Sequence, residues 1–253
     1  MPADRLRASL AAAFAQRAPL HARPDLTTYR LADGAGDGLP GLYVDRFGPA
    51  AVLNVYDDAR LSAAEVTRAA ELSLELLAPS GLESVYVKPF VRDRSRLGGQ
   101  APEETRTAAP RAGRPQPETV VVREYASQFE VRLYDGFSTG LFLEHREHRQ
   151  ALARLRPQRA LNLFAYTCAF SVPLAAAGTL VANVDVSARY LDWGRRNAAL
   201  NELPGDRLRY HRMDALEYLA WAEKRPGERF DLVILDPPTF AAGDARRGRR
   251  PGR

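Results

Sequence analysis

Hydrophobic and polar positions alternate along the chain in two different rhythms. At the start, apolar residues recur at helical spacing from Leu6 to Phe14, which predicts a helix over residues 3–19 of an N-terminal segment, 1–23. Residues 24–156 then alternate short apolar runs with turn formers, the pattern of a small, mostly antiparallel α+β domain. Its expected strands cover residues 28–31, 42–45, 51–56, 84–90, 119–124 and 128–134, and its expected helix covers 62–77.

One long stretch interrupts this first region. Residues 92–118 contain turn formers and charges but hardly any large apolar side chain. A segment of this composition buries too little apolar surface to offset the entropy of ordering it. We therefore expect a mobile loop or an insertion there.

The second region, residues 157–240, follows a strand–helix–strand rhythm. Such alternation is typical of parallel strands joined by right-handed crossovers, so the sequence predicts a doubly wound α/β sheet of four strands. The expected strands cover residues 160–164, 180–186, 208–211 and 230–235, and the expected helices cover 170–177, 188–200 and 215–223.

Composition and charge narrow the class of protein. With 253 residues, 45% hydrophobic and 26% charged, the chain is globular and has no apolar run long enough to span a membrane. Its net charge of +5 is concentrated in residues 241–253, where five arginines face one aspartate, so the charge says little about the body. The single cysteine excludes an internal disulfide and fits a reducing cytoplasm.

Aspartates follow three of the four strands expected in the second region. Asp185, Asp214 and Asp236 stand at or just after strand ends. Because parallel strands end at one edge of a sheet, these carboxylates should line one rim, where open α/β sheets bind ligands. Asp185 also has the spacing from the first strand that suits an acid holding a ribose. Asp185 and Asp214 could instead cap the helices that follow them.

The turn after the first of these strands decides between cofactors. A nicotinamide-dependent dehydrogenase would carry Gly-x-Gly-x-x-Gly there, and the chain has no such cradle for a pyrophosphate. S-adenosylmethionine (SAM), which contains adenosine but no phosphate, fits the acids and this turn better. We expect SAM as cofactor and identify no metal site; a dehydrogenase is the less favoured alternative.

The most specific string follows the fourth strand and contains Asp236, Pro237, Pro238 and Phe240. Two consecutive prolines remove two backbone donors and leave carbonyl groups free to accept hydrogen bonds from a planar substrate. Phe240 could stack on that substrate. We assign these four residues to catalysis, against the alternative of a simple turn with Phe240 in the core.

Five motifs together resemble a known family. They are GDGLPGLYVD (36–45), TGLFLEHREHR (139–149), LNLFAYTCAF (161–170), NVDVS (183–187) and DPPTF (236–240). In this order they are similar to a bacterial family of SAM-dependent ribosomal RNA methyltransferases, which includes large-subunit cytosine-C5 enzymes and guanine-N7 relatives. The resemblance implies a class I methyltransferase domain behind a small RNA-facing α+β domain.

The resemblance also implies roles for single residues. The cofactor would be surrounded by three acids and one turn, with Asp185 on the ribose, Asp214 on the adenine amine and Asp236 near the methionine part and target base. The turn consists of Phe164, Ala165, Tyr166, Thr167 and Cys168. Arg146 and Arg149 would lie at the cofactor or RNA edge, with a plain charged helix face as an equal alternative.

The chain departs from that family at three points. No RNA-binding PUA module precedes residue 28, and Cys168 stands where many members have glycine. Cytosine-C5 methylation needs a cysteine thiolate that adds to C6, whereas guanine N7 has its own lone pair. Cys168 is the only cysteine, and its place in the cofactor turn predicts a small buried hydrophobe rather than that nucleophile.

The last expected strand, 230–235, has the apolar composition of an interior strand, yet the few residues after it cannot form another strand–helix unit. We expect a truncated or frame-shifted form, or one half of something completed by another chain. The sequence thus predicts a methyltransferase acting on a base of large-subunit ribosomal RNA, weak or inactive in this form. A non-catalytic RNA- or cofactor-binding fragment is the alternative, and a homodimer is possible.

Overall fold

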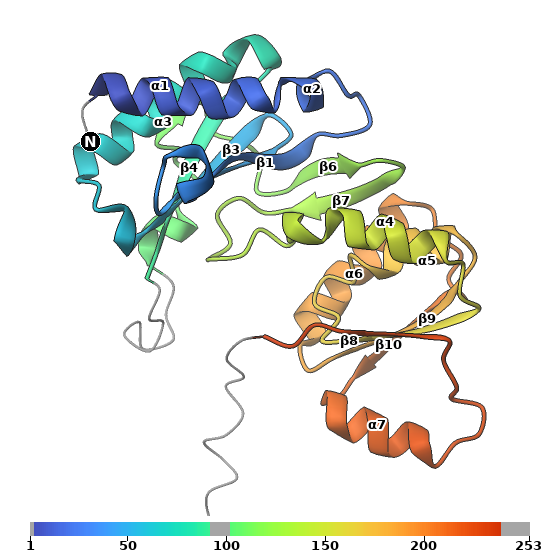
Figure 1. The fold of residues 1–253 in the computed structure, drawn as a ribbon. Coiled ribbons are helices and arrows are strands. Elements are labelled where there is room, and N and C mark those ends of the chain that lie inside the picture. The colour runs from blue at the N-terminus through green and yellow to red at the C-terminus, as the bar shows by residue number, and fades with distance from the viewer. Residues whose placement is uncertain (1–2, 92–101, 239–253) are drawn as a thin grey trace, which may run out of the picture. The chain divides into compact units, whose positions relative to one another are not determined.

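The computed structural model describes residues 3–91 and 102–238, and it divides into two compact units, Met1–Arg146 and Glu147–Arg253 (Figure 1). The sequence analysis places the boundary after residue 156. The difference is one helix, α4 (Arg146–Arg154), nearly all of which belongs to the second unit. No helix in the described part of the chain is long and apolar enough to cross a membrane.

The first unit is built on a five-stranded sheet in the order β1-β2-β3-β4-β5. Its pairs are antiparallel except β3 with β4, which run parallel because the helix α3 (Ala63–Leu77) crosses between them. The strands are β1 (Thr28–Asp33), β2 (Leu42–Phe47), β3 (Ala50–Tyr56), β4 (Ser84–Phe90) and β5 (Ala112–Gly113).

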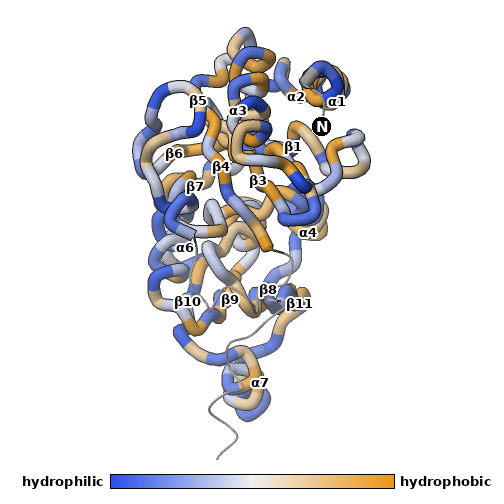
Figure 2. Tube along the Cα trace, turned by 90° about the vertical axis from the view of Figure 1, so that its left-hand side faces the viewer, coloured by the Kyte–Doolittle hydropathy of each residue, from blue (hydrophilic) through white to orange (hydrophobic). Residues whose placement is uncertain are grey.

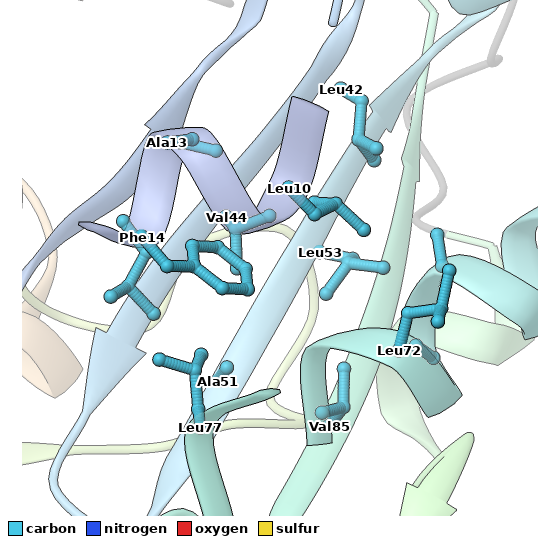
Figure 3. Packing of buried hydrophobic residues seen from close by; sticks show 14 of the residues in the cluster. Leu10, Ala13, Phe14, Leu42, Val44, Ala51, Leu53, Leu72, Leu77 and Val85 are labelled. Carbon is cyan, nitrogen blue, oxygen red and sulfur yellow. The ribbon is translucent and has the colours of Figure 1, made fainter. Parts of the chain in front are cut away.

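Two helices, α1 (Ala3–Gln16) and α3, cover one face of this sheet. Figure 3 shows Leu10 and Phe14 of α1 and Leu72 of α3 packed over Val44 and Leu53 of the strands. Both helices contain hydrophilic and hydrophobic residues (Figure 2), and the buried ones include Leu10 of α1 and Leu72 of α3. The first unit also contains the short helix α2 (Ala18–His21) and the 3₁₀ turns η1 (Gly34–Asp37), η2 (Asp57–Ala59) and η3 (Ala78–Ser80).

Part of the segment expected to be a loop is ordered. Residues 92–101 lie outside the described residues, but η5 (Glu103–Arg106) and β5 follow. Thr105 is buried, and Ala112 pairs with Val85 of β4. The expectation therefore misses structure that depends on pairing with a distant strand rather than on local composition.

A separate hairpin, β6 (Val120–Glu124) and β7 (Ser127–Val131), ends the sheet structure of the first unit. It is tied back by an isolated bridge between Leu26 and Glu124. The 3₁₀ turn η6 (Leu143–His145) leads from it to α4.

The second unit is a four-stranded parallel sheet in the order β10-β9-β8-β11, which confirms the expected α/β class. Helix α5 packs Leu174 and Ala175 on one face, and α7 packs Tyr218 and Ala222 on the other. The elements are β8 (Arg159–Leu163), α5 (Ser171–Ala176), β9 (Leu180–Asp185), α6 (Ala188–Leu200), β10 (Leu208–Arg212), α7 (Ala215–Glu223) and β11 (Leu232–Leu235).

Strand β11 lies at one edge of this sheet. Among the described residues it pairs only with β8. Its outward residues, Val233 and Leu235, are 53% and 64% exposed, whereas Ile234 is buried against the α5 face. The described part of the unit thus has an apolar strand with one face and one edge in solvent.

Candidate functional site

The strand register brings the acidic residues of the second unit to one rim. Leu163 is level with Val184 on one side and with Leu235 on the other. One residue further along, Asp185 and Asp236 therefore flank the end of β8. Two strand spacings place their Cα atoms about 10 Å apart. This rim lies at the carboxyl ends of the strands, as expected for a ligand site in an open parallel sheet.

Asp185 fixes the loop beside it rather than a helix. Its Oδ2 accepts a hydrogen bond from the backbone N–H of Tyr166 at 2.9 Å, and its Oδ1 accepts from that of Ser187 at 2.8 Å. Ser187 is the N-cap of α6, where its hydroxyl accepts from the N–H of Tyr190. The alternative that Asp185 caps α6 is wrong. Each carboxylate oxygen keeps a second acceptor position for another donor.

Asp214 does cap a helix. Arg212 is level with Asp185 in the sheet, and Asp214 stands two residues further, at the start of α7. Its Oδ1 accepts from the N–H groups of Leu216 at 2.8 Å and Glu217 at 3.3 Å. Its Oδ2 makes no hydrogen bond within the described chain. The capping alternative is therefore confirmed, and one oxygen is left for a ligand.

The turn after β8 has a strained backbone. Phe164, Tyr166 and Cys168 have φ values of 55°, 48° and 58°, in the left-handed region that residues other than glycine rarely adopt. Such residues persist only where their surroundings hold them, and they cluster at functional sites. Here the holding bonds include the N–H of Ala165 to Val184 O at 3.0 Å and the side-chain amide of Asn197 to Thr167 O at 3.0 Å.

The side chains of this turn point mostly inward. Ala165, Thr167 and Cys168 are buried, whereas Phe164 and Tyr166 are half-buried. The turn therefore offers a ligand mainly its backbone and two aromatic rings. This differs from a glycine-rich phosphate cradle, in which successive N–H groups converge on an anion.

Cys168 is chemically inert in this position. Its side chain is fully buried against Gly194 of α6, where any Cβ would collide with the sulfur atom. Burial, reinforced by the nearby Asp185 carboxylate, raises the pKa of the Cys168 thiol far above its ordinary value. Because a thiolate is the reactive form, the expectation of a buried hydrophobe is confirmed.

A polar network under the rim was not identified from the sequence. The amide of Asn162 donates to the Ser171 hydroxyl at 3.0 Å and to Asn183 Oδ1 at 3.2 Å, and Asn183 donates to Arg209 O at 3.2 Å. Asparagine is rare in buried strands unless its amide is satisfied. The two asparagines within apolar strands, Asn162 in β8 and Asn183 in β9, were therefore the feature of the sequence that could have indicated this network.

Three aromatic residues form a wall beside Asp185. The ring of Tyr166 lies edge-on to Tyr190 of α6, with centroids 4.4 Å apart, and 6.5 Å from Trp193. Edge-to-face pairs of this kind contribute about 0.5–1.5 kcal/mol beyond their buried area. These contacts hold the turn against α6, and Tyr166 and Tyr190 are half-buried whereas Trp193 is buried.

The remaining site predictions fall in different surroundings. Arg149 is buried, with its guanidinium 5.9 Å from the Phe170 ring, so it presents no exposed face to RNA. Arg146 is half-buried at the first residue of α4.

The residues predicted for catalysis follow β11. Asp236, Pro237 and Pro238 are exposed there, and Phe240 lies outside the described residues.

Comparison with known proteins gives consistent matches. Residues 106–248 match the family model described as S-adenosylmethionine-dependent methyltransferase. "Ribosomal RNA large subunit methyltransferase I" of Salmonella paratyphi C is 35% identical over 218 residues, covering 85% of this chain and 51% of that protein. The protein of the same name from Aeromonas salmonicida is 34% identical over 234 residues, covering 91% and 56%. The chain spans about half the length of the curated relatives it matches.

Solved structures agree at the level of the fold. The crystal structure of SMU.776 complexed with SAH has a TM-score of 0.79 at 24% identity and covers 97% of this chain and 60% of that one. A SAM-dependent methyltransferase from Agrobacterium tumefaciens has a TM-score of 0.59 at 23% identity, covering 87% and 62%.

Proposed function

Because the chain belongs to the S-adenosylmethionine-dependent methyltransferase family, we propose that its second unit binds SAM at the rim of the parallel sheet and directs the methyl group to a base of large-subunit ribosomal RNA. The observation that carries this proposal is Asp185, held by two backbone N–H groups at the end of β9. The RNA class is supported by the names of the relatives.

The residues present fit the adenosine part of SAM. Asp185, anchored through Tyr166 and Ser187, keeps acceptor capacity for the two hydroxyl groups of a ribose. The Oδ2 of Asp214 would accept from the adenine amine while Oδ1 keeps the helix cap. Tyr166 and Tyr190, which meet edge to face and are both half-buried, offer apolar neighbours for the adenine ring.

The transfer step depends mainly on positioning. Bound SAM supplies a methyl group on a sulfonium, which is attacked in line by a nucleophilic base atom. Asp236 would accept hydrogen bonds from the methionine amine or the base, and the carbonyl groups around Pro237 and Pro238 would orient the base. The stacking role of Phe240 stays a prediction.

The target atom is cytosine C5 or guanine N7. Cytosine-C5 transfer requires a thiolate, and the one thiol in these 253 residues is the buried Cys168. Guanine-N7 transfer requires none. We therefore propose that any turnover that needs no thiol beyond these residues is directed to N7.

A second candidate is a fragment that binds RNA or cofactor without turnover. One observation favours it over a cytosine-C5 enzyme: the one thiol in these 253 residues is buried, and burial raises its pKa. Methyl incorporation into ribosomal RNA that lacks its modifications separates the candidates: measurable transfer supports the enzyme, and its absence with intact SAM binding supports the fragment.

Calorimetric titration with SAM tests the site itself. We expect saturable binding of SAM and none of NAD. The Asp185→Asn variant should bind SAM about 10- to 100-fold more weakly, since a hydrogen bond to a charged acceptor is worth about 1.5–3 kcal/mol. Asp192→Asn is the matched control, because Asp192 is exposed on α6 and pairs only with Arg195 among the described residues. Tight NAD binding, or equal SAM affinity in both variants, would contradict the proposal.

A further inference from the structure

The polar network beneath the rim consists of three buried side chains, Asn162 of β8, Ser171 of α5 and Asn183 of β9. Burying a polar side chain costs stability unless its groups find partners, a requirement that apolar residues at these places would not have. Because all three side chains are buried, they do not contact a ligand at the rim themselves. Their polarity therefore needs a reason other than direct contact with SAM.

Asn183 is the centre of this network. Its Oδ1 accepts a hydrogen bond from the Asn162 amide at 3.2 Å and another from the Ser171 hydroxyl. Its own amide donates to Arg209 O of β10 at 3.2 Å. A single side chain of β9 is thus bonded to β8, to α5 and to β10.

The network joins the two ends of the strained turn. Asn162 lies in β8 just before the turn, and Ser171 is the first residue of α5 just after it. The Asn162 amide donates to the Ser171 hydroxyl at 3.0 Å, and the N–H of Ser171 donates to Cys168 O at 2.9 Å. The chain before the turn and the chain after it are therefore fixed to each other as well as to Asn183.

The middle of the turn is held by Asp185. This residue follows Asn183 by two positions on β9, so both side chains leave the same face of the sheet. Asp185 accepts from the N–H of Tyr166 at 2.9 Å, and the N–H of Ala165 donates to Val184 O at 3.0 Å. Strand β9 thus holds the ends of the turn through Asn183 and its middle through Asp185.

This turn needs such support because its backbone is strained. Phe164, Tyr166 and Cys168 all have positive φ values without being glycine. Conformations of this kind persist only where the surrounding structure holds them. If a supporting bond is removed, part of the population leaves the conformation, and the apparent affinity for a ligand falls with the fraction of molecules that still bind it.

We propose that Asn183, together with Asn162 and Ser171, positions the SAM site: the network holds the turn and Asp185 in their binding arrangement before the cofactor arrives. The inference rests on the proposed binding of SAM at this rim and adds three residues that do not touch the cofactor. Such preorganisation raises affinity because the turn need not be ordered at the moment of binding.

Calorimetric titration of the full chain with SAM tests the inference. Ser171→Ala, which removes one hydroxyl, should weaken SAM binding about three- to tenfold, and Asn183→Ala about 10- to 100-fold. The triple variant Asn162→Leu, Ser171→Ala and Asn183→Leu removes side-chain donors and acceptors together. It should therefore unfold in urea at nearly the concentration of the unaltered chain, yet bind SAM as weakly as Asn183→Ala does.

Leu174→Ala is the matched control. Leu174 is buried on the α5 face of the same sheet, outside the network, and its truncation lowers stability by leaving a cavity. At a temperature where every variant is folded, Leu174→Ala should bind SAM with unchanged affinity. Loss of SAM binding without loss of stability in the triple variant, and the reverse in Leu174→Ala, distinguishes positioning from general stabilisation.

Tryptophan emission gives a direct readout of the turn. The ring of Trp193 lies 6.5 Å from that of Tyr166, and Trp193 is the only tryptophan in a Trp221→Phe background. In that background, the emission of unliganded Asn183→Ala should differ from that of Trp221→Phe alone. Saturation with SAM should bring the two emission spectra together, because the bound cofactor selects the supported form of the turn.

Unchanged SAM affinity and unchanged Trp193 emission in Ser171→Ala and in the triple variant would overturn the inference. If the unaltered chain binds SAM in the same experiment, the proposed function remains intact. An equal loss of SAM affinity in folded Leu174→Ala would also overturn the inference, because the network would then act only through stability. Absence of SAM binding by the unaltered chain would refute the proposed function, and with it the inference that rests on it.

Discussion

At the scale of single residues, Cys168 and Gly194 are a complementary pair. The sulfur atom of Cys168 occupies the space that a side chain at position 194 would need, inside α6. Glycine in a helix interior costs about 1 kcal/mol relative to alanine, so its presence here indicates a packing requirement. The pair explains how the chain accommodates a cysteine in a turn whose φ of 58° favours glycine.

Gly194→Ala should therefore destabilise the second unit by about 1–3 kcal/mol, despite its better helix propensity. Cys168→Gly in the same chain should recover most of the loss, because it removes the colliding sulfur atom. Urea unfolding of the two single variants and the double variant gives the coupling energy. Strictly additive effects would show that the two residues do not share one space.

Lys88 is a second residue whose surroundings have a measurable consequence. Its ammonium group is buried on β4, where it donates to Phe137 O at 3.3 Å. Burial, only partly opposed by the charge of Asp135, lowers the pKa of Lys88 from 10.5 to about 7. Because the unfolded chain binds this proton more tightly, the group costs stability at neutral pH, and the cost shrinks as pH rises from about 7 towards 10.5.

The free energy of unfolding should thus increase between pH 7 and pH 9, with a slope of at most about 1.4 kcal/mol per pH unit from this group. Lys88→Met should remove the slope and stabilise the first unit at pH 7. The control is Lys224→Met, since Lys224 is exposed and is the only other lysine. Urea midpoints measured across this pH range test the prediction. If the pH dependence of stability persists in Lys88→Met, it arises from another group.

At the scale of elements, Asp214 combines two roles that substitutions can separate. Serine is a good N-cap but has no carboxylate. Asp214→Ser should leave thermal unfolding nearly unchanged and weaken SAM binding, whereas Asp214→Ala should also lose about 1 kcal/mol of stability. Ser62→Ala, which breaks the capping box of α3 in the other unit, is the control for a pure capping loss. Equal SAM affinity in Asp214→Ser would restrict Asp214 to the cap.

The periodicity of the sequence predicts most elements of the second unit closely. Strands expected at 180–186 and 208–211 are found at Leu180–Asp185 and Leu208–Arg212. The strand expected from residue 230 begins at Leu232, although the N–H of Asp231 already donates to Arg159 O at 2.9 Å. Local pattern is sufficient where burial on both faces makes a strand continuously apolar.

What the sequence does not reveal depends on distant partners. β5 forms because Ala112 meets β4, which no local pattern announces. The left-handed turn at Phe164–Cys168 contains no glycine at its strained positions and is recognised only from its backbone. The candidate rim was predictable because aspartates after parallel strands converge by topology, but the polar network beneath it depends on side-chain contacts between β8, α5 and β9.

At the scale of the whole molecule, strand β11 exposes apolar side chains on one face of the second sheet. Val233 is level with Leu161 and Leu235 with Leu163, so these side chains share the face of the sheet on which α7 packs. Leu216 of α7 is also exposed, at 67%. Exposed apolar residues on an edge strand promote association between chains.

Replacing both outward residues of β11, as Val233→Thr with Leu235→Lys, should reduce self-association at high concentration. Static light scattering against concentration measures it, and the expected result is a lower apparent mass with an unchanged far-ultraviolet circular dichroism spectrum. Leu155→Lys is the matched control, since Leu155 is similarly exposed, at 69%, but follows α4 rather than lying on an edge strand. If the β11 double variant and Leu155→Lys have the same apparent mass, β11 is not the edge through which the chains associate.

The inaccessibility of the one native thiol has a practical consequence for measuring how the two units are arranged. A cysteine introduced at exposed Arg68 on α3 would be the only group that a maleimide dye reaches in the folded protein, with no need to alter Cys168. Both tryptophans, Trp193 and Trp221, belong to the second unit and serve as intrinsic energy donors. Energy transfer from them to the dye would then report the separation of the units, with and without RNA.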